Sequence, residues 1–143
     1  MNVLVTGGAG FIPSHIVDRL LKDGHKVTVL DLWESDESKV HNGNSNFEFI
    51  KGDVLNDDLI AQCMEGKDRV IHMAAVLGTA ETITTFDVEK VCTVNIVGTT
   101  KILKAAKKAG VGRVLIPTTP DVPWINPYKI TKAAVEKLCQ LFS

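Results

Sequence analysis

The chain has 143 residues, of which 45% are hydrophobic and 23% are charged, as in an ordinary globular domain with a real core. Its formal net charge of −1 offers no electrostatic attraction for nucleic acid or for an anionic membrane. We therefore expect residues 1–143 to form a single domain with no nucleic-acid partner and no membrane partner.

The three cysteines are widely spaced and include no C-x-x-C pair; they are Cys63, Cys92 and Cys139. This pattern favours reduced, mostly structural thiols, a cytoplasmic setting and no metal site. The sequence also lacks a basic N-terminal region, a cleavage site and an apolar run of the roughly 20 residues that a membrane span needs. We expect neither a signal peptide nor a membrane span.

The first elements in the chain are a strand, a glycine-rich turn and a helix. Residues 2–5 predict a strand buried on both faces, residues 6–10 (TGGAG) a tight turn, and residues 11–22 a helix. The apolar side of this helix is expected to consist of Ile12, Ile16, Leu20 and Leu21. Small residues let the backbone approach an anion, and the first N–H groups of the helix point toward it. The segment therefore predicts a phosphate cradle.

Pro13 stands three residues after Gly10, where the usual dinucleotide motif has its third glycine. Proline is tolerated in a first helical turn because its missing N–H has no intrahelical partner there. Its ring is bulkier than a glycine hydrogen, so we expect the cradle to be retained with a looser or shifted helix.

Strands and helices alternate along the rest of the chain. Strands are expected at residues 26–30, 47–50, 69–72 and 113–116, and helices at residues 57–64, 87–109 and 128–142. Residues 34–46 are polar and turn-rich, which predicts a surface loop. Strands separated by helices imply a doubly wound, parallel, five-stranded Rossmann sheet of order 3-2-1-4-5 with helices on both faces. A ligand would lie at the carboxyl ends of the first and fourth strands.

Carboxylates and small residues follow three of these strands. Asp31 can accept hydrogen bonds from a ribose diol and repels an additional phosphate, which favours NAD over NADP; the alternative is a strand-end turn residue. Asp53 could bond an adenine amino group while Val54 packs on the ring, although Gly-Asp is also common turn chemistry. Ala74 and Ala75 leave room for a cofactor against the backbone.

A tyrosine and a lysine on the last helix suggest acid–base chemistry. Tyr128 and Lys132 are four residues apart and share a helix face. A lysine ammonium favours phenolate, so a tyrosine with an ordinary pKa of about 10 would act as a base nearer neutral pH. A hydroxyl of Thr118 or Thr119 could bond the reacting substrate oxygen. His72 is interpreted as a buried, hydrogen-bonded histidine of the core and not as the base.

In this order the motifs resemble those of the extended short-chain dehydrogenase/reductase family, specifically its NAD-dependent nucleotide-sugar epimerases and dehydratases. The resemblance covers essentially the whole chain and rests on TGGAGFIPSH, VLD, GDV, HMAA, NIVGT and PYKITK. It implies that Tyr128 is the acid/base, that Lys132 lowers its pKa and binds the nicotinamide ribose, and that Thr119 is the catalytic hydroxyl. The implied cofactor-binding residues are Gly7, Gly10, Phe11, Ile12, Asp31, Asp53, Val54, Ala74, Ala75, Asn95 and Lys132. Asn95 would also support the active-site architecture.

Two further features depart from the family pattern. Only eight residues separate Thr119 from Tyr128, where relatives carry a longer loop, although eight extended residues span about 25 Å. Relatives also continue into a C-terminal substrate domain beyond the point at which this sequence ends, Ser143. Three interpretations stay open: a compact or truncated epimerase/dehydratase-like oxidoreductase, an NAD-binding non-catalytic module or assembly subunit, and a fragment. The expected small-molecule partner is a nucleotide sugar.

The family resemblance also implies a homodimer or higher oligomer. The helices at residues 87–109 and 128–142 are expected to pack together and to pair across a two-fold axis. Candidate buried positions on them are Val91, Ile96, Ile102, Val135, Leu138 and Leu141. An exposed sheet edge or apolar patch would promote association.

Overall fold

The computed structural model describes residues 1–77, 87–119, 123 and 125–142. Within this part of the chain, five strands form one parallel sheet of order β3-β2-β1-β4-β5. The strands are β1 (Asn2–Thr6), β2 (Lys26–Asp31), β3 (Phe47–Lys51), β4 (Arg69–His72) and β5 (Arg113–Leu115). The predicted sheet and its strand order are therefore confirmed.

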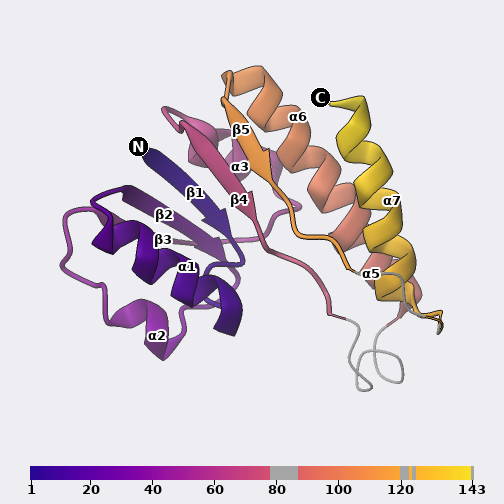
Figure 1. Cartoon of the computed structure of the whole chain (residues 1–143), viewed down its shortest axis with the longest axis horizontal. Coiled ribbons are helices and arrows are strands. Elements are labelled where there is room, and N and C mark those ends of the chain that lie inside the picture. Colours follow the sequence, from indigo (N-terminus) through magenta and orange to yellow (C-terminus); the bar gives the residue numbers. More distant parts are fainter. Residues whose placement is uncertain (78–86, 120–122, 124, 143) are drawn as a thin grey trace.

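Helices cover both faces of the sheet (Figure 1). They are α1 (Phe11–Lys22), α2 (Asp36–Lys39), α3 (Asp57–Met64), α5 (Val88–Cys92), α6 (Thr99–Ala109) and α7 (Pro127–Leu141). A π-helical segment, η1 (Thr93–Gly98), joins α5 to α6 without interruption. The helix predicted at residues 87–109 is thus one continuous rod with a widened turn, and it ends at Gly110, whose φ of 71° is left-handed. No helix in the described part of the chain is long and apolar enough to cross a membrane.

The alternation of side chains along the central strand produces two separate cores. Val3 and Val5 of β1 point toward α1 and pack with Val17. Leu4 points to the opposite face, where it joins Ile60 of α3 and Ile102 of α6. Because β1 is buried on both faces, it is the rigid base from which the following glycine turn projects.

The structure corrects the predicted apolar side of α1 at Ile12, whereas Leu20 and Leu21 pack against the core as predicted. Pro13 and Val17 are buried, whereas Ile12 is 65% exposed. Successive residues of a helix lie about 100° apart, so a buried face set by Pro13 and Val17 turns Ile12 away from the sheet. Pro13 itself fits the first turn, because the first intrahelical bond runs from Ser14 N to Gly10 O (2.9 Å) and uses no proline N–H.

Two further expectations are corrected. The predicted loop at residues 34–46 contains the short helix α2, because Ser35 caps it by accepting a bond from Ser38 N. Leu141, expected to be buried, is 75% exposed because it lies about 120° around α7 from buried Val135. Val91, Ile102 and Val135 are buried as predicted. Ile96 and Leu138 are half-buried.

The predicted packing of the last helices is confirmed. Helix α7 contacts α5, η1 and α6, and Figure 1 shows α6 and α7 side by side near the β5 edge of the sheet. This arrangement brings the beginning of α7 toward the segment that follows β4, where the candidate site lies.

Candidate functional site

The glycine turn packs tightly against the segment that follows β4. Gly7 has a φ of 69°, and a Cβ atom built on it would lie 2.6 Å from Ala74 N. Gly7 N also donates to Leu30 O of β2 at 2.8 Å. A side chain at this position would therefore combine backbone strain with a backbone clash. The turn joins the carboxyl ends of β1, β2 and β4, as predicted for a dinucleotide cradle.

The first turn of α1 is open toward this edge of the sheet. Gly10 is its N-cap and makes no side-chain cap, and Gly10 N donates to Gly7 O at 3.1 Å. Phe11 is 78% exposed, and the first turn holds no acidic residue. Helix N–H groups in such a position favour a negative charge. The residues present therefore fit a pyrophosphate.

Asp31 connects the second strand with the glycine turn. Its carboxylate accepts bonds from Ala9 N (3.0 Å) and Leu32 N (2.7 Å). Burial raises the pKa of Asp31, and the bonds from backbone N–H groups act in the opposite direction. A carboxylate has about four acceptor positions, so the bonds from backbone N–H groups leave capacity for a ribose hydroxyl.

Two other predicted cofactor residues have structural partners of their own. Asp53 accepts a bond from Leu55 N (3.0 Å), which is the turn chemistry considered as its alternative. Val54 is buried in the core shared with α3 and α6, and a Cβ on Gly98 would lie 3.1 Å from it. Ala75 follows Ala74 and is half-buried.

Helix α7 holds the predicted tyrosine and lysine close together. Asn126 caps the helix by accepting a bond from Lys129 N (2.8 Å), and Pro127 occupies its first turn. The Nζ of Lys132 lies 6.0 Å from the centre of the Tyr128 ring. Lys132 is buried and Tyr128 is half-buried.

The direction of the Tyr128 pKa differs from the prediction. Burial raises the pKa of Tyr128, whereas the prediction was that Lys132 lowers it. Burial also lowers the pKa of Lys132, an effect that Cys139 partly opposes. The reason lies in the geometry, because Lys132 Nζ lies over the aromatic ring and, among the described contacts, makes no hydrogen bond to the phenol oxygen. Desolvation therefore determines the direction in which the pKa of Tyr128 shifts.

The predicted hydroxyl partner is not joined to this pair. Thr119 is half-buried and Thr118 is exposed in the segment after β5. Among the described residues, no hydrogen bond connects Thr119 with Tyr128 or Lys132. The eight-residue segment between Thr119 and Tyr128 lies partly outside the described residues, at 120–122 and 124.

Asn95 links the end of the sheet to α7 from within the π-helical turn. Its Oδ1 accepts from Val76 N (2.7 Å), and its Nδ2 donates to Val76 O and to Thr131 Oγ1 (both 3.0 Å). Thr131 Oγ1 in turn donates to Tyr128 O at 2.8 Å. Thr131 was missed by the sequence reasoning. Its signal was a threonine beside Lys132 that can bond a carbonyl of the preceding turn.

His72 is a core residue, as predicted. It is 2% exposed, and its ring nitrogens contact Thr6 Oγ1 (2.6 Å) and Thr99 Oγ1 (3.0 Å). Burial, followed by the charge of Lys132, lowers the pKa of His72 to about 3. The described residues include no group of three or more His, Cys, Asp or Glu side chains arranged to hold a metal ion.

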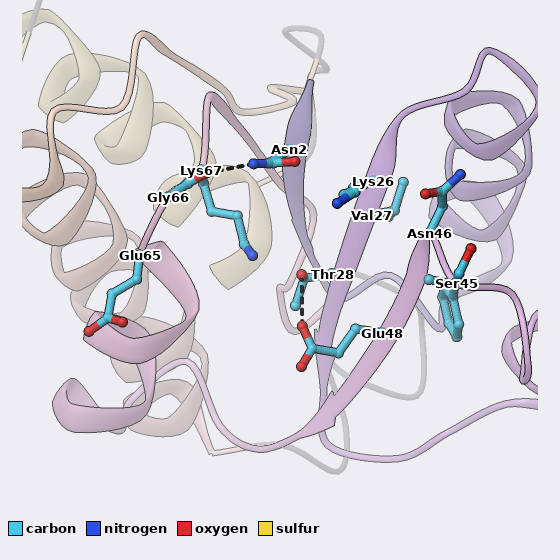
Figure 2. A pocket seen from close by; sticks show the side chains of 11 residues that line it. Asn2, Lys26, Val27, Thr28, Ser45, Asn46, Glu48, Glu65, Gly66 and Lys67 are labelled. Carbon is cyan, nitrogen blue, oxygen red and sulfur yellow. Dashed lines mark hydrogen bonds between the residues drawn. The ribbon is translucent and has the colours of Figure 1, made fainter.

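A hollow of about 260 Å³ lies at the opposite edge of the sheet from the glycine turn (Figure 2). It lies between the amino ends of the strands and the end of α3, where Asn2 Nδ2 donates to Gly66 O (3.0 Å) and Thr28 Oγ1 donates to Glu48 Oε2 (3.1 Å). Ligands of open α/β sheets bind outside the carboxyl ends of the strands. The glycine turn, not this hollow, is therefore the candidate site.

A sheet of order 3-2-1-4-5 with a glycine turn at its switch point and a Tyr-x-x-x-Lys helix beside it defines a dinucleotide-binding domain of the short-chain dehydrogenase/reductase class. The sequence profile of the 3-beta hydroxysteroid dehydrogenase/isomerase family matches residues 4–138. The chain belongs to this family, which lies within the extended group of that class.

Curated and solved relatives agree with this assignment. UDP-glucose 4-epimerase of Mycolicibacterium smegmatis is 37% identical over 99% of this chain and 51% of its own length. A solved epimerase of Methanothermobacter thermautotrophicus is 30% identical with a TM-score of 0.86, over 99% of this chain and 47% of that one. The dTDP-glucose 4,6-dehydratase DesIV of Streptomyces venezuelae, solved with NAD bound, is 28% identical with a TM-score of 0.84, over 99% and 51%. The chain thus spans about half the length of these relatives.

Proposed function

We propose that this chain is the NAD-binding domain of a nucleotide-sugar epimerase or dehydratase-like oxidoreductase. The observation that carries the proposal is the close approach of Gly7 to Ala74, which holds the backbone of the glycine turn against the segment after β4 at the carboxyl end of the sheet. Asp31 supports NAD over NADP because its carboxylate, already anchored by Ala9 N, repels an additional phosphate. The relatives solved with NAD include the dehydratase above and a protein in complex with UDP-glucose and NAD.

In this proposal the protein positions the reactants and moves a proton. Bound NAD supplies the hydride chemistry. Tyr128 exchanges a proton with a sugar hydroxyl, Lys132 binds the nicotinamide ribose, and Thr119 bonds the reacting oxygen. The lysine is suited to an enclosed position because its stem is buried beside the tyrosine ring.

A non-catalytic NAD-binding module is the second candidate. It requires the cofactor site alone and no proton transfer by Tyr128. The two candidates share the cofactor site and differ only in turnover. The enzyme candidate takes a nucleotide sugar as its substrate and either epimerises it or eliminates water from it.

Calorimetric titration with NAD and with NADP tests the cofactor site in the chain and in a Tyr128→Phe variant. We expect both proteins to bind NAD in preference to NADP. The variant should bind as the unmodified chain does, because Tyr128 is assigned to proton transfer and not to cofactor binding. Addition of UDP-glucose or dTDP-glucose then separates the candidates. If the added sugar reduces NAD bound to the chain but not NAD bound to Tyr128→Phe, the enzyme is supported. Binding of NAD without its reduction supports the module. If neither dinucleotide binds, both are wrong.

We further propose that the chain associates through the helices beside the site. Large apolar side chains are exposed on α5, η1 and α7, namely Val88, Val97 and Ile130. Such side chains favour association when they lie together on a surface. Sedimentation over a range of protein concentrations tests this. A single monomeric species at the highest concentration would contradict it.

A further inference from the structure

A line of buried hydrogen bonds crosses the molecule between the glycine turn and α7. Thr6 ends β1, His72 ends β4 and Thr99 begins α6, and all three residues are buried. His72 Nδ1 lies 2.6 Å from Thr6 Oγ1, and His72 Nε2 lies 3.0 Å from Thr99 Oγ1. The imidazole therefore bridges two hydroxyls that belong to different elements.

The partners of the two hydroxyls determine where the protons lie. Thr99 Oγ1 donates its proton to Asn95 O at 2.6 Å, so it can only accept from His72. His72 must then have its proton on Nε2. Burial keeps the ring neutral, so Nδ1 has a lone pair and accepts the proton of Thr6 Oγ1. Thr6 Oγ1 in turn accepts a long bond from Ala74 N (3.5 Å).

All bonds of this line point in one direction. Ala74 N donates to Thr6, Thr6 donates to His72, His72 donates to Thr99, and Thr99 donates to Asn95 O. Hydrogen bonds arranged in this way polarise one another and strengthen the series. A reversed histidine tautomer would leave two acceptors, His72 Nε2 and Thr99 Oγ1, facing each other, so only one proton arrangement satisfies every atom.

The two ends of the line lie at the two halves of the candidate site. Ala74 N is the atom closest to a Cβ built on Gly7, at the base of the cradle. Asn95, at the other end, bonds Thr131 Oγ1, which bonds Tyr128 O in the first turn of α7. Among the described residues, the His72 ring bonds the end of β1 to Thr99 at the start of α6, and Asn95 separately bonds Val76 in the segment after β4.

We propose that His72 is a positioning residue, which in its neutral form protonated on Nε2 fixes the glycine turn relative to the helix that carries Tyr128 and Lys132. The inference rests on the proposed function in that the turn binds NAD and the helix faces the reacting group. It extends that function because NAD bound at the turn stabilises the first turns of α7 through the line, without contacting Asn95 or Thr131.

Thr99 allows a matched pair of variants. Thr99→Val keeps the shape of the side chain and removes the hydroxyl, whereas Thr99→Ser keeps the hydroxyl. Hydrogen–deuterium exchange of the α7 amides is measured with and without NAD in both variants and in the unmodified chain. We expect NAD to slow exchange in α7 in the unmodified chain and in Thr99→Ser. In Thr99→Val, NAD should still bind and this slowing should be lost.

Nitrogen-15 NMR of the unmodified chain provides a second measurement, which does not depend on how any substitution affects folding. The expected spectrum of His72 has a proton on Nε2 and none on Nδ1, and the spectrum of the half-buried His25 serves as comparison. A proton on Nδ1, or NAD-dependent slowing that survives in Thr99→Val, overturns the inference. A failure of the unmodified chain to bind NAD refutes the proposed function as well. Binding of NAD without any slowing in α7 refutes the inference alone.

Discussion

Acidification is expected to destabilise this fold through one residue, His72. The imidazole is buried and its pKa is lowered to about 3 by burial and by the charge of Lys132. In the unfolded chain a histidine has a pKa of about 6.5. Below pH 6.5 the unfolded state therefore binds a proton that the folded state refuses. The resulting stability is complete above pH 6.5 and is lost as the pH falls toward 3.

The size of this effect follows from the difference between the two pKa values. Each pH unit within the window costs about 1.4 kcal/mol of the free energy of unfolding. Between pH 7 and pH 5 the expected loss is about 2 kcal/mol, and over the whole window it is about 5 kcal/mol as an upper limit. A loss of this size is a large share of the stability of a small domain.

Urea unfolding followed by circular dichroism at pH 7, 6 and 5 measures the loss. The comparison is with His72→Gln, in which the side chain at position 72 does not titrate in this range. Other groups, including Asp31 with its raised pKa, act equally in both proteins and cancel in the difference. We expect the unmodified chain to lose about 2 kcal/mol more than His72→Gln between pH 7 and pH 5. Parallel pH dependences would refute the reasoning.

Three further substitutions test the site. Gly7→Ala should abolish measurable NAD binding and cost about 1–3 kcal/mol in urea unfolding, because it combines a φ of 69° with a backbone clash. Gly24→Ala is its matched control, since Gly24 has a φ of 78° and nothing within 4 Å, so it should lose stability and keep NAD binding. Asp31→Ala should weaken NAD binding about tenfold and remove the preference over NADP, as measured by calorimetry. An unchanged preference would argue against Asp31. Thr131→Val should cost about 1–3 kcal/mol, because it leaves Asn95 Nδ2 with one partner fewer; equal urea midpoints would contradict this.

The sheet could be predicted because its rules act over short stretches of sequence. Residues 2–10 combine an apolar run with a glycine turn, and the alternation of strands with helices restricts the crossovers to one hand. The same local information failed at α2, where a serine cap within a polar stretch forms a helix that looked like loop. It also failed at Ile12, because the buried face of a helix depends on how the helix sits on the sheet.

Motif and spacing named the candidate site residues Gly7, Asp31, Tyr128 and Lys132, but not the bonds that connect their elements. The bonds that join the elements link residues far apart in the chain, such as Thr6 with His72, and no local pattern encodes them. The direction of the Tyr128 pKa was missed for the same reason, because desolvation depends on everything that packs around the ring.

The π-helical turn η1 makes the length of its segment more important than its composition. Two backbone carbonyls of this widened turn accept hydrogen bonds from threonine hydroxyls one turn ahead. Thr99 donates to Asn95 O (2.6 Å), and Thr100 donates to Ile96 O (2.8 Å). Deletion of the exposed Val97 would restore an ordinary α-helix and would improve local helical geometry. It would also rotate α6 relative to α5 by about 100°. Asn95 could then no longer face Val76 and α7 together, so a chain with a more regular helix would have a misaligned site.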